Sequence, residues 1–227
     1  VSGDSATPTT ITTTTSFYQH PLGSNTEAGY NAGFFTAYPE MEYDSFLTIG
    51  LDQPALGSNG EEATGVVEDE NATPISTGFA NGQSLIIDSF IGSAWYVTAS
   101  DFASNSQAGA EKRILFAQVT TDGDLDGLVQ FQVYRNGNQD PANCLRPYLP
   151  VNPLNDPGCT DETACNFDAS AFVNDGSCDF CSCADTSGTT LLSFENDIVP
   201  EYALDVELVA DHDTTDIASL QGHKTYR

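Results

Sequence analysis

The segment KRILFAQVTTDGDLDGLVQFQVY (Lys112–Tyr134) decides the fold class. In its second arm the apolar side chains of Val129, Phe131 and Val133 alternate with polar ones, the period-2 pattern of a strand with one buried face. The first arm, from Ile114 to Val119, is apolar on both faces, which is typical of a central strand. The letters DGDLDG between the arms are turn formers. The segment therefore predicts a β-hairpin.

Similar patterns lie on both sides of this segment. Further strands are predicted around Ile11 and at Met41–Leu51, Ser84–Phe90, Ala94–Thr98 and Tyr202–Ala210. Helical periodicity is missing apart from one turn near Ile217–Leu220. About seven strands separated by turn signals predict an all-β protein, an antiparallel β-sandwich of jelly-roll or immunoglobulin-like type.

Two segments leave alternatives open. The threonine-rich residues 1–16 favour an edge strand, because the aromatic residues that follow require burial, and an O-glycosylated stalk is the alternative. The Gly/Asn-rich loop 21–38 carries Tyr30, Phe34, Phe35 and Tyr38. These rings are expected to plug the end of the sandwich, or else to stack on sugars.

The second diagnostic stretch is GCTDETACNFDASAFVNDGSC (Gly158–Cys178), which we call the cassette. Five of the six cysteines lie in or just after it, and we expect all six to form disulfides in an oxidising compartment. They are Cys144, Cys159, Cys165, Cys178, Cys181 and Cys183. A zinc site built on the C-x-x-C pair Cys178 and Cys181 is the weaker alternative, because no second pair follows at a matching distance. The pairing stays open.

These patterns divide the chain into three parts. Residues 1–143 are expected to form the sandwich, 144–185 the disulfide-rich cassette and 186–227 a C-terminal strand segment. The sequence has neither an initiator methionine nor a signal peptide, so we interpret it as a processed chain or a fragment.

The net charge of the chain limits the classes of partner that it can bind. Asp and Glu number 33 against 6 Lys and Arg, which gives a net charge of −27. Such a surface repels nucleic acid and anionic membranes and attracts hard cations such as Ca²⁺. No apolar run approaches the ~20 residues that a membrane-spanning helix needs. We expect neither nucleic-acid binding nor membrane insertion.

Two loops are candidate calcium sites. Asp122, Asp124 and Asp126 with Gly127 match the start of a D-x-D-x-D-G calcium loop, but its twelfth position is Val133 rather than a carboxylate. Turn formation is the alternative role of these residues. The cassette is the stronger candidate, because disulfides would hold its side-chain oxygens in place and ion binding would add order to a module with little core. Its candidate ligands are Asp161, Asn166, Asp168, Asn174 and Asp175.

Three further sequence patterns give weaker indications of function. Asn71 begins an N-glycosylation sequon that is followed by Pro74. The group Asp211-His212-Asp213 is interpreted as a polar loop rather than a metal site. None of the common catalytic motifs occurs in a usable context, and we expect no enzyme.

Several blocks together resemble a repeat module of large secreted surface proteins of marine bacteria and microalgae. The blocks are YDSFLTIGLD (43–52), GSAWY (92–96), ILFAQVTTDGDLDG (114–127), FQVYRNG (131–137), the cassette and the tail YALDVELVADH…TYR (202–227). The cassette is similar to a short repeat of the form GCTD-x-x-AC-N-aromatic-D…DGSC. The resemblance implies an extracellular, repeated module and covers about two thirds of the chain.

One departure concerns the order of these blocks. In the proteins that the chain resembles, the Y-x-L-x-V-E strand and the TYR segment open the module, whereas here they close it. The chain is therefore expected to be one repeat in a permuted frame. Its strand, with inward Leu204, Val206 and Leu208 after Tyr202, either completes a neighbouring sheet head to tail or closes the chain's own sheet.

The sequence therefore predicts an extracellular structural module that self-assembles into a filament or surface appendage and binds Ca²⁺. The alternative is an adhesin or glycan-binding module.

Overall fold

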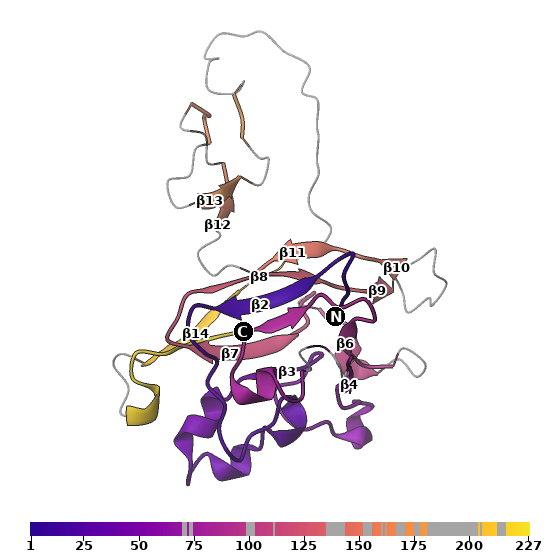
Figure 1. The fold of residues 1–227 in the computed structure, drawn as a ribbon, viewed down its shortest axis with the longest axis vertical. Coiled ribbons are helices and arrows are strands. Elements are labelled where there is room, and N and C mark those ends of the chain that lie inside the picture. The colour runs from indigo at the N-terminus through magenta and orange to yellow at the C-terminus, as the bar shows by residue number, and fades with distance from the viewer. Residues whose placement is uncertain are drawn as a thin grey trace. The chain divides into compact units, whose positions relative to one another are not determined.

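The computed structural model describes residues 1–69, 72, 75–98, 103–110, 112–134, 144–151, 156–159, 161, 163–166, 171–174, 178–180, 204, 206–212 and 217–227. The chain forms two compact units (Figure 1). Unit 1 combines Val1–Val151 with Leu204–Arg227, and unit 2 is Asn152–Ala203. This division into two units differs from the three parts that the sequence predicts, because the C-terminal segment belongs to unit 1.

The larger sheet of unit 1 has seven strands. They are β1 (Ser2–Gly3), β2 (Thr9–Thr13), β4 (Gly65–Val67), β5 (Leu85–Ile87), β6 (Ser93–Tyr96), β8 (Leu125–Gln130) and β11 (Tyr148–Pro150). All pairings within it are antiparallel, and β8 pairs with β1, β2 and β11. The threonine-rich segment thus forms a strand, as favoured, but β2 is an interior strand between β8 and β5 and not an edge strand.

The second sheet has four strands in the order β14–β15–β7–β3. They are β14 (Leu208–Asp211), β15 (Lys224–Tyr226), β7 (Ala117–Thr121) and β3 (Phe46–Leu47). All five residues of β7 are buried, as expected for a central strand. A separate two-stranded pair joins β9 (Val133–Tyr134) to β10 (Cys144–Leu145).

Both sheets contribute to one hydrophobic core. The core includes Trp95, Ile11 and Val129 from the seven-stranded sheet and Leu47 and Val119 from the four-stranded sheet. Trp95 is fully buried, as expected, and its indole nitrogen donates to the carbonyl of Phe116 at 3.0 Å. The prediction of an all-β chain with antiparallel sheets and a disulfide-containing cassette is confirmed.

The predicted Lys112–Tyr134 hairpin is wrong in its pairing. Strands β7 and β8 overlap the two predicted arms, but β8 begins at Leu125, inside the predicted turn, and ends at Gln130, and the two strands belong to different sheets. Strand β7 pairs with β15 and β3, and β8 pairs with β2, so residues 122–124 carry the chain from one sheet to the other. Alternation predicts that a strand forms and which face is buried, but it does not choose the partner strand.

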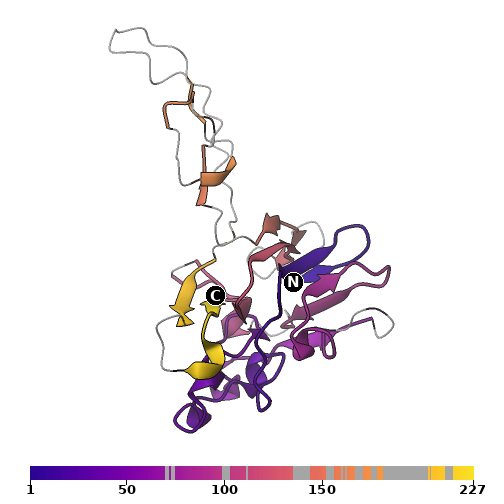
Figure 2. The ribbon, with the colours of Figure 1, turned by 60° about the vertical axis from the view of Figure 1, so that its left-hand side comes forward.

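The predicted strand Met41–Leu51 is shorter than expected. Only Phe46–Leu47 is a strand, and Pro39–Tyr43 forms the 3-10 helix η3, with Pro39 at its first position. Two more 3-10 helices, η1 (Glu27–Gly29) and η2 (Ala32–Phe34), precede it. Figure 2 shows this part of the chain, in indigo and purple, gathered at one side of unit 1.

Within the described residues, the other short helices are η4 (Gly57–Asn59), η5 (Phe79–Asn81), η7 (Ser104–Ser106) and η12 (Ala218–Leu220). The last confirms the helical turn predicted near Leu220. Unit 2 contains β12 (Asp156–Gly158) and β13 (Ala171–Asn174), which pair in parallel. Over the described ranges, none of the helices is long and apolar enough to cross a membrane.

Candidate functional site

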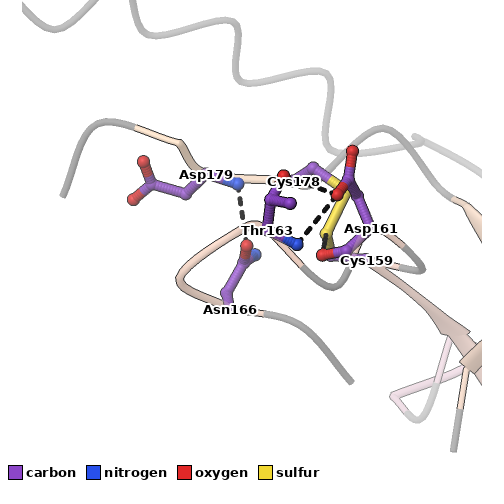
Figure 3. Close-up of a disulfide and its surroundings, with 6 residues drawn as sticks. All are labelled: Cys159, Asp161, Thr163, Asn166, Cys178 and Asp179. Atoms are coloured by element: carbon purple, nitrogen blue, oxygen red, sulfur yellow. Dashed lines mark hydrogen bonds between the residues drawn. A yellow bond between two sulfur atoms is a disulfide. The ribbon is translucent and has the colours of Figure 1, made fainter. Parts of the chain in front are cut away.

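The cassette is closed by a disulfide between Cys159 and Cys178, whose Cα atoms lie 4.6 Å apart (Figure 3). Cys165 is also disulfide-bonded. The sulfur of Cys178 is therefore not available to the zinc site considered as an alternative. Because structural disulfides persist in oxidising compartments, the chain is suited to a non-cytoplasmic location.

Two of the predicted calcium ligands in the cassette already accept hydrogen bonds from the protein. Asp161 accepts from the backbone nitrogen and the hydroxyl of Thr163, at 2.9 and 2.6 Å. These bonds, the hydroxyl first, lower the pKa of Asp161 below its usual value. The side-chain oxygen of Asn166 accepts from the backbone nitrogen of Asp179 at 2.7 Å (Figure 3).

Asn166 thus fastens its loop to the residue after Cys178, and the backbone nitrogen of Cys165 adds a bond to the Asp179 carbonyl. The other three candidates lie outside what the structure describes: Asp168 and Asp175 entirely, and Asn174 for its side chain.

Residues 122–127, which form the turn at 122–124 and the start of β8, are held by threonines of β2 and of the turn after it. The hydroxyl of Thr15 donates to the carboxylate of Asp122 at 2.5 Å, which lowers the pKa of Asp122. The backbone nitrogen of Asp124 donates to the Thr14 hydroxyl at 2.9 Å. The carboxylate of Asp126 accepts from the nitrogen of Gly127 at 2.7 Å.

These contacts give the loop a structural role in joining the two sheets. Within the residues that the structure describes, no group of three or more His, Cys, Asp or Glu side chains is arranged to hold a metal ion. Calcium binding, at this loop or in the cassette, stays a prediction.

The C-terminal segment Leu204–Arg227 closes the four-stranded sheet. Strand β15 lies between β14 and β7, with Thr225 opposite Thr120. The hydroxyls of these two threonines are 2.7 Å apart, and Thr120 also donates to the carbonyl of Tyr43. This pairing is one of the two alternatives that the sequence left open, closure of the chain's own sheet.

His212 takes part in the same buried network. Its Nε2 lies 2.9 Å from the Thr225 hydroxyl, and its ring meets that of Tyr43 edge-on at 4.3 Å. Burial lowers the pKa of His212 below its ordinary value. His212 is therefore buried rather than exposed in a polar loop, and Asp211 belongs to β14; Asp213 lies outside the described ranges.

Arg227 fixes the end of the segment. Its guanidinium donates to the side-chain oxygen of Gln118 at 2.6 Å and to the Tyr30 hydroxyl at 3.4 Å, and it lies 3.5 Å from the carboxylate of Asp52. No motif signalled this role, because its partners are far away in the sequence.

The predicted inward face of this strand is partly confirmed. Leu204 and Val206 pack against the core, but Leu208 is 49% exposed at the start of β14. The register shifts between Leu208 and Ala210, which breaks the simple alternation. Tyr202 lies outside the described ranges.

The aromatic loop mainly closes one end of unit 1. Tyr30 is buried against Phe46 and Phe35, and its hydroxyl donates to the carbonyl of Glu42 at 2.8 Å. Phe34 and Tyr38 remain exposed. Phe35 is half-buried, so Phe34 and Tyr38 are the two of the four rings with the most surface on which a sugar would stack.

A buried carboxylate, Asp44, was not singled out by the sequence. It accepts from the backbone nitrogen of His20 at 2.6 Å and from those of Ser24 and Ser45. Burial nevertheless raises its pKa to about 7, because desolvation of the charge outweighs these three bonds. A Cβ atom on Gly23 would lie 1.8 Å from one of its oxygens, so the turn that Asp44 organises requires glycine there.

Two further predicted sites have different outcomes. Cys144 in β10 carries a free thiol, so the expectation that all six cysteines are paired fails at this position. Cys181, Cys183 and the sequon residue Asn71 lie outside the described part of the chain.

In comparisons with known proteins, no family model, no curated protein and no solved structure matches this chain.

Proposed function

We propose that the chain is a structural module of an extracellular assembly, in which the C-terminal segment of one copy completes the four-stranded sheet of the next. The observation that carries this proposal is the position of β15. It lies in the interior of the sheet, between β14 and β7, and the chain reaches it from β7 only by way of unit 2.

The contacts of the segment are extensive and independent of connectivity. Leu220, Thr225 and Tyr226 are buried, His212 is fully enclosed and Arg227 has three side-chain partners. Each contact has the same geometry whether the segment belongs to the same chain or to a neighbour. Exchange between copies therefore preserves the enthalpy of the closed form.

The connection to the segment favours exchange. Unit 2 separates Val151 from Leu204, a span of roughly fifty residues, and closing so long a loop within one chain costs entropy that grows with its length. A neighbour at high local concentration competes with that closure. Head-to-tail donation is a heterologous contact, and repetition of it generates a filament.

Light scattering on the full chain tests whether it self-assembles. We expect species well above the 24.2 kDa chain mass, increasing with protein concentration and with salt, because salt screens the repulsion of a −27 charge. Addition of a chelator should shorten the assemblies if calcium stabilises the cassette. A single 24.2 kDa species at all concentrations and salt levels would contradict the proposal.

A further inference from the structure

The C-terminal segment Leu204–Arg227 contains two of the three histidines of the chain, His212 and His223. The backbone nitrogen of His212 donates to the carbonyl of His223 at 2.9 Å, so the two residues lie next to each other. His212 directly follows β14, the strand at the edge of the four-stranded sheet, and is fully buried. His223 directly precedes β15 and is half-buried. The His212 ring is therefore a titratable group that water reaches when this segment moves away from the sheet.

A chain of hydrogen bonds, which we call the relay, fixes the nitrogen that carries the proton of neutral His212. The hydroxyl of Thr120 donates to the carbonyl of Tyr43 at 2.6 Å, because a carbonyl can only accept. This bond uses the single proton of Thr120, so the hydroxyl of Thr225 is the donor in its 2.7 Å contact with Thr120. The oxygen of Thr225 therefore accepts from the Nε2–H of His212, at 2.9 Å. A second proton on the ring has to bind at Nδ1.

The relay joins three elements of unit 1. His212 and Thr225 belong to the C-terminal segment, Thr120 to β7 and Tyr43 to η3. The two threonines are fully buried, and the ring of Tyr43 meets that of His212 edge-on, with the ring centroids 4.3 Å apart. The neutral ring is thus accommodated by its surroundings, whereas a second proton would place a full charge where water does not solvate it.

The elements packed against His212 offer little to compensate that charge. Among the described residues, β7 and η12 contain no charged side chain. In η3, Glu40 lies 3.6 Å from His20, and Glu42 is exposed. The group of this helix that contacts the His212 ring is the aromatic ring of Tyr43.

The remaining neighbours of the ring belong to the segment itself and to the turn after β7. Asp211 favours a charged His212, and His223 opposes it. Lys224 lies opposite Asp211 across the pair of β14 and β15, and Asp122 lies close to His223. Burial has the largest effect on the pKa of His212 and Asp211 the smallest, so this pKa is lowered from its ordinary value.

We propose that His212 is a pH-sensitive latch: the neutral ring holds the C-terminal segment in the four-stranded sheet, and protonation of the ring releases the segment. As a regulator of assembly the latch rests on the segment exchange proposed above, because the released segment is the species that exchanges between copies. Acid pH therefore speeds exchange, and a return to neutral pH fixes each segment in the sheet that it has reached.

The direction of the pH dependence follows from proton linkage. The ring of a released His212 has the ordinary histidine pKa of about 6.5, and the buried ring has a lower one. As the pH falls below about 6.5, the released form binds a proton that the buried form excludes, so release becomes more favourable. Between pH 7.5 and pH 5 the equilibrium constant for release increases by at most about 30-fold, the limit for a ring that binds no proton while it is buried.

The test is hydrogen exchange of the backbone amides of the full chain at pH 5 and pH 7.5, measured in the peptide that contains β15. Each observed rate is divided by the intrinsic rate at that pH, because this ratio measures how often the segment opens. In the wild type the ratio is expected to rise several-fold at pH 5, up to the limit of about 30-fold. Strand β2 of the other sheet is the internal reference, because protonation of Asp44 stabilises unit 1 as a whole in the same pH range.

Two variants separate His212 from the other titrating groups. His212→Gln retains a side-chain N–H donor and cannot bind a proton, so its ratio should not rise at pH 5. The matched control is His223→Gln, which removes the other titratable ring of the segment at a half-buried position and should retain the rise. A level ratio in the wild type, or an equal rise in His212→Gln, would overturn the latch.

A second measurement does not require His212→Gln to fold. In the wild type, the NMR signals of the His212 ring should titrate below the ordinary pKa of about 6.5 and in step with the loss of protection in β15. Titration at about 6.5 without that loss would also overturn the latch.

Failure of the latch and failure of segment exchange give different results. Hydrogen exchange detects release of the segment from its own sheet or from a neighbour's, whereas light scattering detects assembly. Release at pH 5 in a chain that remains a single 24.2 kDa species would support the latch and contradict segment exchange. Large assemblies whose segment stays protected at pH 5 would overturn the latch alone.

Discussion

Replacement of Gly127 by alanine should destabilise unit 1 by about 3 kcal/mol or more. A Cβ atom at this position would lie 2.2 Å from the backbone oxygen of Thr10 and 3.1 Å from the Cα of Ile11. Both obstacles are backbone atoms of β2, which pairs with β8 directly opposite Gly127. No side-chain rotation removes the clash, so the central pairing of the sheet has to open.

The control is Gly57→Ala, because nothing lies within 4 Å of a Cβ atom built on Gly57. Its effect should stay within about 0.5 kcal/mol. Denaturant unfolding followed by Trp95, the single tryptophan, measures both variants. Similar losses of unfolding free energy in the two variants would show that the close approach of β2 to Gly127 does not contribute to the stability of the sheet.

Asp44 should make stability depend on pH in the direction opposite to an ordinary paired carboxylate. Its pKa rises from 3.8 in the unfolded chain to about 7 in the folded chain. Between these values the folded chain holds a proton that the unfolded chain has released. The free energy of unfolding therefore falls as the pH rises from about 4 to about 7, by up to about 4 kcal/mol, and is level above that range.

The variant Asp44→Asn cannot ionise and should lack this fall. The observable is the difference between the unfolding free energies of Asp44→Asn and wild type, measured from pH 4 to pH 8, since contributions of the other titrating groups cancel in it. A constant offset is expected from altered bonding to the nitrogens of His20, Ser24 and Ser45. A difference that does not change with pH would mean that Asp44 is ionised at little cost.

Local pattern was sufficient for the class of fold and for the core. Alternation around Val129 and the β-branched and aromatic content near Ile11 and Trp95 predicted strands that formed, because burial of one face is encoded within a few residues. The partners of these strands were not predictable in this way. Strand β8 pairs with β2, which precedes it by more than a hundred residues, and β7 pairs with β15, which follows it by as many.

The long-range contacts of the candidate site were likewise not predictable from local sequence patterns. The D-x-D-x-D-G pattern marked a turn that covers only residues 122–124, because Leu125 begins β8, and the sequence did not show that Thr14 and Thr15 would bond to this part of the chain. Gly127, interpreted as part of a calcium loop, is required instead by the close approach of β2. The roles of Asp44 and Arg227 depend on partners brought together by folding, so no local motif announced them.

The most direct test of segment exchange is a disulfide between β7 and β15. The hydroxyls of Thr120 and Thr225 are 2.7 Å apart across the strand pair, so Thr120→Cys with Thr225→Cys places two sulfurs in contact. The protein is assembled, oxidised and run under denaturing, non-reducing conditions, with Thr225→Cys alone as the control for the native cysteines. Exchange predicts a ladder of covalent multimers in the double variant only. Cross-linked single chains, recovered from material that was assembled before denaturation, would show that each segment closes its own sheet and would contradict the account.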